Sequence, residues 1–282
     1  MRHISSIYEK GSRPMNEDRV VLHEEADRYA VVDGATGIDG IPGELAASVL
    51  AQNMEQPPGE VELLSIVKVA NETLGRKNVR EYGGDASIAD VPKEARSTCG
   101  IAAIQLNEDR TLSYVQTGDC MIFVQYKDGS IRALTYDHVA QFDDIALKRL
   151  EETRERASGG QLLNDAIFEQ EIKPILLDNR RKLNTKEGYP ILDGSEEALD
   201  FLDWGTLPLL NVDRLLLLSD GLQLPDGKGD GEIWMETARY AFTYGLEALR
   251  DRVHQMEEED SDCLKYPRFK KADDKSGVLI SL

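Results

Sequence analysis

The chain has 282 residues, and its 52 acidic and 33 basic side chains give a formal net charge of −19. This acidity argues against sequence-independent binding of nucleic acid and against attraction to an anionic membrane, because both need a surface rich in Lys and Arg. A hydrophobic content of 41% is enough for a sizeable core. No apolar run approaches the 18 residues of a membrane-spanning helix, so we expect no contact with a membrane.

The cysteines give an indication of the cellular compartment. The chain has three isolated cysteines, Cys99, Cys120 and Cys263. They form no C-x-x-C pair, which argues against a zinc site or a redox motif. The first residues lack the apolar core of a secretory signal. An odd number of cysteines without such a signal fits a reducing environment, so we expect a cytoplasmic protein.

The first third of the chain predicts one strand and two helices. Residues 28–34 form a continuous apolar run that is typical of a buried strand. Residues 43–54 and 60–81 carry apolar side chains at helical spacing. Residues 83–92 are expected to form a loop.

Four strand patterns follow, separated by short polar turns such as "NEDR" and "KDGS". They cover residues 97–106, 111–118, 120–126 and 131–136. Strands joined by such short turns usually pair with their neighbours in the sequence. The pattern therefore predicts antiparallel meanders.

The remaining elements alternate helices and strands without strict repetition. The expected order is a helix at 138–156, a mixed segment at 160–205, a strand at 213–222, helical spacing at 232–257 and a final strand from 273 onward. We expect the first and last strands of the chain to share a sheet. This order predicts an α+β fold with antiparallel sheets and outer helices.

Carboxylates recur at the ends of the predicted strands. Asp33 and Asp220 each end an apolar strand and precede a glycine, and further acids stand beside other strands: Asp18, Asp119, Asp273 and Asp274. Carboxylates gathered at one sheet edge repel each other, and Mg²⁺ or Mn²⁺ removes that cost through oxygen ligation. A single Asp-Gly pair is more often an ordinary turn, but the whole series favours a metal site.

The motifs around these acids stand in a definite order. They read "RPMNED" from residue 13, "DGATG" from 33, "STCG" from 97, "TGDC" from 117, "LSDG" from 218 and "ADDKSGVLI" from 272. "LTYDHVAQ" from 134 and "ASGG" from 157 fit between them. In this order the sequence resembles the metal-dependent protein phosphatases of type 2C, from about residue 11 to the last residue.

The resemblance implies a four-layered αββα sandwich of two antiparallel sheets flanked by helices. It also implies one domain over residues 1–282, with a variable flap at about 160–205 that influences the choice of substrate. The expected reaction is hydrolysis of phosphoserine and phosphothreonine on proteins by a water that two metal ions activate. No covalent phosphoenzyme is needed.

The resemblance also implies the roles of individual residues. Asp33 would bridge two Mn²⁺ or Mg²⁺ ions, and the Gly34 carbonyl would bind one of them. Asp220 and Asp273 would bind the other ion, and Arg13 would bind the phosphate. Asp18 would bind the ion on the Gly34 side or hold one of its waters, and Glu17 is the second choice for this role. Asp119 would bind a third, more weakly held ion.

Four positions depart from the family pattern: Ala35, Thr36, Cys120 and Gly277. Ala35 stands where many members have a histidine that is proposed as the general acid. None of the four removes an expected primary ligand. They leave two alternatives open, a catalytically weak or inactive regulatory protein and a hydrolase of small phosphate esters.

Other features predict the partners. Arg180, Arg181, Lys182 and Lys186 lie together in an acidic chain, and we hypothesise that they contact a phosphoprotein substrate. A solvated basic loop is an equally good interpretation. His138 is expected at the start of a helix rather than in the chemistry. We further expect a monomer that acts opposite a partner kinase.

Overall fold

The structure is a computed structural model of the chain that describes residues 2–56, 62–84, 87–156, 167–225 and 232–282. Its ten strands form two five-stranded sheets in which every pairing is antiparallel. The first sheet has the order β1 (His3–Glu9), β10 (Lys275–Ser281), β9 (Val212–Leu218), β6 (Met121–Tyr126) and β7 (Ile131–Ala133). The second has the order β2 (Asp18–His23), β3 (Arg28–Ala35), β4 (Thr98–Leu106), β5 (Thr111–Thr117) and β8 (Asp203–Pro208).

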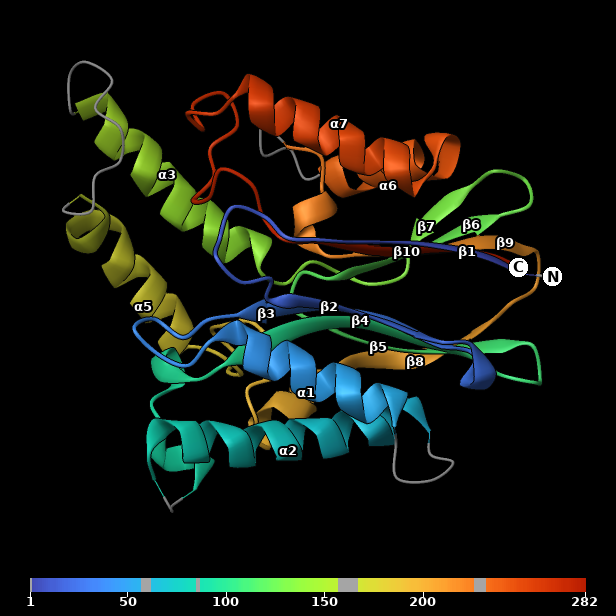
Figure 1. Ribbon diagram of the computed structural model, residues 1–282, viewed down its shortest axis with the longest axis horizontal. Coiled ribbons are helices and arrows are strands. Elements are labelled where there is room, and N and C mark those ends of the chain that lie inside the picture. The colour runs from blue at the N-terminus through green and yellow to red at the C-terminus, as the bar shows by residue number, and fades with distance from the viewer. Residues whose placement is uncertain (1, 57–61, 85–86, 157–166, 226–231) are drawn as a thin grey trace.

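Helices cover the outer faces of both sheets (Figure 1). The second sheet is covered by α1 (Gly43–Glu55) and α2 (Leu63–Tyr82), and the first by α6 (Ile233–Tyr244) and α7 (Leu246–Glu259). Two further helices, α3 (Ala140–Arg156) and α5 (Lys173–Arg181), stand at the end of the sheets opposite to the chain termini (Figure 1). The predicted four-layered αββα sandwich is confirmed.

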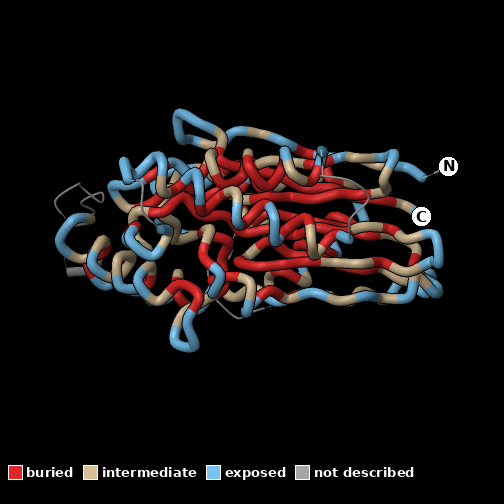
Figure 2. The backbone as a smooth tube through the Cα atoms, turned by 90° about the horizontal axis from the view of Figure 1, so that it is seen from below, coloured by how far each residue is buried: buried red, intermediate tan, exposed pale blue. Residues whose placement is uncertain are grey.

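The strands in the middle of each sheet are buried on both faces, which explains their continuous apolar sequences. In β4, Ile101 packs toward α1 and α2, whereas Ile104 packs into the space between the sheets. In β9, Leu216 faces α6 and α7, whereas Leu217 faces the other sheet. Successive side chains of a strand point to opposite faces, so a strand between two apolar layers needs apolar residues at every position. Figure 2 shows this buried interior along the length of the sheets.

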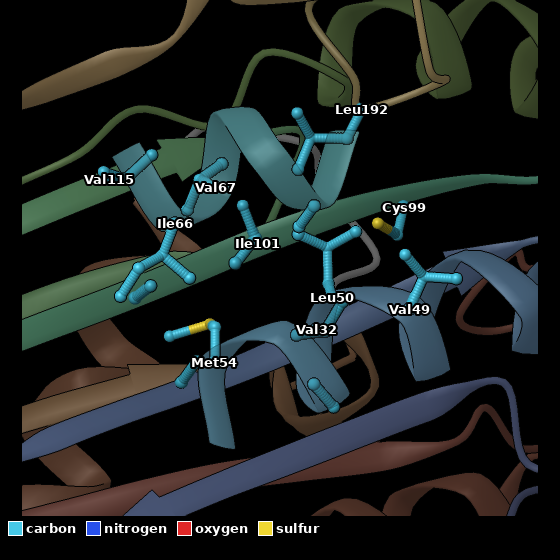
Figure 3. Close-up of a cluster of buried hydrophobic side chains, with 14 of the residues drawn as sticks. Val32, Val49, Leu50, Met54, Ile66, Val67, Cys99, Ile101, Val115 and Leu192 are labelled. Atoms are coloured by element: carbon cyan, nitrogen blue, oxygen red, sulfur yellow. The ribbon is translucent and has the colours of Figure 1, made fainter. Parts of the chain in front are cut away.

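The layer below the second sheet is a dense cluster (Figure 3). Leu50 and Met54 of α1 and Ile66 of α2 are almost completely buried against Val32 and Ile101. Burying one such side chain contributes about 1.5–3 kcal/mol. The helical spacing predicted for residues 43–54 and 60–81 therefore reflects one shared apolar interface.

Three expectations about the strands and helices need correction. The four strands from 97 to 136 do not form one meander, because β4 and β5 pair in one sheet whereas β6 and β7 pair in the other. The helical pattern at 232–257 contains two helices that are separated by Gly245, whose φ of +94° ends the first helix. Strand β8 was not expected, since its burial alternates only between partly buried and exposed positions.

The N-terminal and C-terminal strands share a sheet, as predicted. They are paired antiparallel from His3 opposite Ser281 to Glu9 opposite Lys275. This pairing places residues 10–17, which follow β1, beside residues 272–274, which precede β10. Ser12 N–H donates to the carbonyl of Ala272 at 2.9 Å.

The described part of the variable segment is anchored to the core. It contains a π-helical turn (Phe168–Ile172), α5 and a 3-10 helix (Glu197–Phe201). Leu192 forms an isolated antiparallel β-bridge with Cys99, near the start of β4, with N–H···O distances of 2.9 and 3.1 Å. Next to it, Arg96 and Asp193 form a buried ion pair at 2.7 Å. This stretch is therefore part of the folded sandwich, whereas the "ASGG" motif lies outside the described residues.

Candidate functional site

The predicted carboxylates meet at one end of the two sheets. Asp18 begins β2 and lies directly opposite Asp33 near the end of β3. Asp220 follows β9, and Asp273 precedes β10, which pairs with β9. Asp119 lies in the turn that passes from β5 in one sheet to β6 in the other. Strand pairing therefore brings together five acids from the ends of five different elements.

Two glycines permit this close approach. A Cβ atom on Gly34 would lie 2.5 Å from the carbonyl oxygens of Glu17 and Gly43. A Cβ atom on Gly221 would lie 1.8 Å from the carbonyl oxygen of Asp274. Only glycine fits at such distances. The Asp-Gly pairs are therefore required by close backbone packing around the carboxylates.

The two neighbouring acids before β10 have different surroundings. Asp274 is buried and accepts hydrogen bonds from the N–H groups of Gly11 and Glu17, both at 2.7 Å. It therefore fixes residues 11–17 against β10. Asp273 instead faces the other carboxylates, since it acts electrostatically on Asp18 and Asp33.

The carboxylates raise one another's pKa values. Burial raises the pKa of Asp18 to about 8, with Asp273 and Asp220 adding to the shift. Burial, followed by the charge of Asp18, raises the pKa of Asp33 well above its usual range. The pKa values of Asp119 and Asp220 rise for the same reasons. Buried and partly buried carboxylates with mutually raised pKa values are characteristic of functional sites.

Two positively charged side chains, Lys270 and Arg13, lie beside the carboxylate cluster. Lys270 Nζ lies 2.5 Å from Oδ1 and 2.6 Å from Oδ2 of Asp273. Arg13 Nη1 donates to Glu17 Oε2 at 2.9 Å, and its half-exposed side chain acts electrostatically on Lys270. Arg13 thus stands at the mouth of the site, where the sequence predicts a phosphate-binding arginine.

Glu17 is held differently from the five aspartates. Its carboxylate accepts hydrogen bonds from Arg13, from Thr36 Oγ1 and from the N–H of Gly43 at the start of α1. It therefore connects the arginine, the "DGATG" loop and α1. Of the predicted pair, Asp18 lies in the carboxylate cluster and Glu17 lies beside it.

Thr36 and Cys120, two of the departures from the family pattern, have structural explanations. Thr36 takes part in the start of α1, because Gly43 N–H also donates to its Oγ1 at 3.0 Å. Cys120 is completely buried, and burial together with Asp33 and Asp119 raises the pKa of its thiol. It is therefore a protonated, small apolar group at the back of the cluster.

The structure adds residues that the sequence analysis did not place at the site. Asp143 in α3 has a pKa raised to about 7 by burial and by Asp220 and Asp137. Arg180 in α5 donates to Thr98 Oγ1 at 2.7 Å and to the carbonyl of Thr36 at 3.2 Å. The predicted basic patch therefore does not form one surface. Arg180 lies beside the site, whereas Arg181 pairs with Glu94 and Lys182 pairs with Asp178 at the surface.

His138 does not cap the helix that follows it. Asp137 does so, since its Oδ1 accepts from the N–H groups of Val139 and Ala140, both at 2.9 Å. The other oxygen of Asp137 accepts from Trp234 Nε1 at 2.8 Å. Asp137 therefore ties the start of α3 to α6, next to the candidate site.

The donor set fits a hard divalent cation. Oδ1 of Asp220 is buried and accepts no hydrogen bond from any described residue, as expected of an atom that binds a metal. All the clustered donors are carboxylate oxygens, which suit Mg²⁺ and Mn²⁺. Within the described ranges, however, no group of three or more His, Cys, Asp or Glu side chains is arranged to hold an ion as it stands. In the structure, both oxygens of Asp273 contact the ammonium of Lys270.

Comparison with solved structures identifies the fold. The catalytic domain of the serine/threonine protein phosphatase PstP in complex with two manganese ions is 19% identical, covers 99% of this chain and 97% of its own, and has a TM-score of 0.55. Stp1 from Staphylococcus aureus is 18% identical. The match covers 100% of this chain and 95% of Stp1, at a TM-score of 0.56. PppA from Pseudomonas aeruginosa is 17% identical. The match covers 99% of this chain and 97% of PppA, at a TM-score of 0.54. The chain has the type 2C phosphatase fold.

Sequence comparison adds nothing to this result, because no family model and no curated protein matches the sequence. The likeness therefore rests on three-dimensional structure, and at these identities it shows the fold. Among the described residues, no helix is both long and apolar enough to cross a membrane.

Proposed function

We propose that the chain is a metal-dependent phosphatase that hydrolyses phosphoserine and phosphothreonine on proteins. The convergence of Asp18, Asp33, Asp119, Asp220 and Asp273 at one end of the sheets supports this proposal above all. A second support is the placement of Arg13 beside the cluster. A structural acidic surface would not gather several buried and partly buried carboxylates at one place, because each would lose part of its hydration.

The proposed ligands are those that the resemblance to the type 2C phosphatases implies. Asp33, with the Gly34 carbonyl and Asp18, would hold one Mn²⁺ or Mg²⁺ ion, and Asp220 with Asp273 would hold the other. Asp119 would serve a third ion, next to Asp137 and Asp143. Two divalent ions supply Lewis acidity that activates water and stabilises charge on a phosphoryl group.

The chain's own residues would orient the substrate. The planar guanidinium of Arg13 can hold two phosphate oxygens at once, which a lysine would do less well. Glu17 keeps this side chain at the rim through the 2.9 Å ion pair. Arg180 adds a second guanidinium near Thr36, and its two hydrogen-bond acceptors there are uncharged, so its positive charge is not cancelled by them.

The physiological setting is part of the same proposal. A phosphoprotein substrate implies a kinase that phosphorylates it, and we propose that the enzyme works as a cytoplasmic monomer. Arg13 lies on residues 11–17, beside Lys270, and Arg180 lies on α5, where its charge acts on Asp143. A phosphorylated side chain that reaches the cluster would meet guanidinium groups from two separate segments of the chain.

The direct test is hydrolysis of a phosphothreonine peptide and of p-nitrophenyl phosphate with Mn²⁺, with Mg²⁺ and with a chelator. We expect turnover that requires metal in the wild type and is lost in Asp220→Asn. Phosphotyrosine peptides and sugar phosphates extend the comparison to small-ester hydrolysis. Absence of turnover with every metal, from a folded protein that still binds Mn²⁺, would favour the non-catalytic alternative.

A further inference from the structure

Lys270 lies among the carboxylates that are proposed to bind the second ion. Its ammonium contacts both oxygens of Asp273, at 2.5 and 2.6 Å. Asp220 and Asp33 also act on it electrostatically. One positive group thus faces three of the proposed ligands, and it engages both oxygens of a carboxylate that would have to give at least one of them to a metal.

We propose that Lys270 is an internal cation that competes with the divalent ion on the Asp220–Asp273 side of the site. The inference rests on the proposed metal-dependent function and adds a property of this chain to it. While the ammonium contacts Asp273, it balances part of the buried negative charge. Because the ammonium contacts both oxygens of Asp273, the ion can take one of them only after the ammonium has released it, and repulsion between the two cations opposes their close approach.

The surroundings allow the side chain of Lys270 to move while its backbone stays in place. Arg268 donates to Asp260 Oδ2 at 2.8 Å and to the carbonyl of Asp260 at 2.6 Å, which fixes the loop before Lys270. Cys263 Sγ donates to the carbonyl of Lys270 at 3.7 Å. The side chain itself is 30% exposed. Withdrawal therefore needs only rotation of its flexible four-carbon stem.

The competition predicts two linked properties. The metal-free protein is stabilised, because the ammonium offsets repulsion between buried carboxylates. The second ion binds more weakly than its ligands alone would allow, because only the fraction of molecules with Lys270 withdrawn is competent. Removal of the ammonium should change these two properties in opposite directions.

The experiment compares wild type, Lys270→Met and Lys271→Met by calorimetric Mn²⁺ titration and by thermal melting, each with and without a chelator. Lys271→Met is the matched control, since it removes one positive charge from the adjacent, exposed position. We expect Lys270→Met to bind one of its Mn²⁺ ions about tenfold more tightly than wild type. Its melting temperature should be lower in chelator, and its rise on adding Mn²⁺ should be larger. Lys271→Met should match the wild type.

Three results would overturn the inference. If the wild type binds Mn²⁺ and Lys270→Met binds it no more tightly, Lys270 does not compete and the proposed function stands. If Lys270→Met lowers the melting temperature equally with and without Mn²⁺, the lysine has only a structural role. If neither protein binds Mn²⁺, the metal-dependent function fails and the inference fails with it. Lys270→Gln repeats the comparison with a polar side chain if the Met variant does not fold.

Discussion

Ser219 and Asp18 join the two sheets at the candidate site. Ser219 Oγ donates to Asp18 Oδ2 at 2.9 Å, and it accepts from the N–H of Ser276 at 3.0 Å. Ser219 follows β9 in one sheet, whereas Asp18 begins β2 in the other. All three residues are buried. One hydroxyl group thus links the two sheets where the carboxylates meet.

Replacement of Ser219 should therefore affect both stability and the site. Ser219→Ala leaves a buried N–H and a buried carboxylate oxygen without this partner, which costs about 1–3 kcal/mol. We expect the free energy of unfolding in urea to fall by that amount, and Mn²⁺ binding to weaken because Asp18 is no longer oriented. Ser130→Ala removes an exposed hydroxyl that bonds Asp128, and should change stability by less than about 0.5 kcal/mol. Equal losses in the two variants would contradict the prediction.

Arg180 and Arg181 are neighbours in sequence with different expected effects on substrate binding. Arg180 faces Thr98 and Thr36 beside the site, whereas Arg181 is largely exposed and pairs with Glu94. We expect Arg180→Gln to raise KM for a phosphothreonine peptide about tenfold, which is the loss of one charged contact of about 1.4 kcal/mol. A small aryl phosphate bound at Arg13 should be affected less than about twofold.

The matched comparison is Arg181→Gln, which should leave both KM values unchanged. If both arginine variants weaken the peptide equally, the exposed basic surface rather than Arg180 contacts the substrate. If Arg180→Gln lowers turnover of both substrates equally, Arg180 acts by positioning the "DGATG" loop instead. Steady-state kinetics with the two substrates distinguishes these cases.

Asp260 gives the protein a defined dependence of stability on acid. Its burial opposes the charged form, but three backbone N–H groups and Arg268 outweigh that effect and hold its pKa at about 2. The folded pKa lies below the ordinary value of 3.8, so the carboxylate stabilises the fold above about pH 4 and loses this contribution as the pH falls toward 2. Solvent screening near the surface reduces the contribution to about 1–2 kcal/mol.

We therefore expect Asp260→Asn to lower the free energy of unfolding by about 1–2 kcal/mol at pH 6. The difference from the wild type should shrink as the pH approaches 2. Asp262→Asn changes an exposed acid two residues away and should follow the wild-type curve. A difference for Asp260→Asn that stays constant from pH 6 to pH 2.5 would show that the ionised state of this carboxylate is not what matters.

The strands next to the site could be predicted because their signals are local. An apolar run that ends in Asp-Gly identifies both β3 with Asp33 and β9 with Asp220, since burial on two faces and a close backbone approach both leave traces in the sequence. The assignment of β5 and β6 to different sheets leaves no such trace. The "TGDC" turn has the length of an ordinary hairpin turn, and only long-range pairing with β8 and β9 separates the two strands.

In the candidate site, too, some residues could be predicted from local sequence signals and others could not. The choice of Asp273 over Asp274 followed from the motif order, and the structure places Asp273 toward the other carboxylates and Asp274 toward backbone N–H groups. Lys270 and Asp143 could not be found, because their positions depend on how a loop and the first turn of α3 fold over the sheet ends. Which of these residues bind metal stays a prediction.

Asp220→Asn should make the metal-free protein more stable while it removes metal binding. Asp220 is partly buried beside Asp33 and Asp273, and burial together with the charge of Asp273 raises its pKa. An uncharged amide of the same shape removes a repelling charge, and it can donate to the Asp33 carboxylate. We expect a gain of about 1–2 kcal/mol, or a melting temperature raised by about 2–8 °C in chelator.

Mn²⁺ should then raise the melting temperature of the wild type much more than that of Asp220→Asn, because the ion loses a ligand and part of its charge balance. Asp213→Asn is the control, since this acid lies on β9, the strand that Asp220 follows, but is half-exposed and paired with Arg214. It should respond to Mn²⁺ as the wild type does. A destabilised Asp220→Asn protein in chelator would mean that the attraction between Asp220 and Lys270 outweighs the repulsion from the neighbouring carboxylates, and it would contradict the predicted gain in stability.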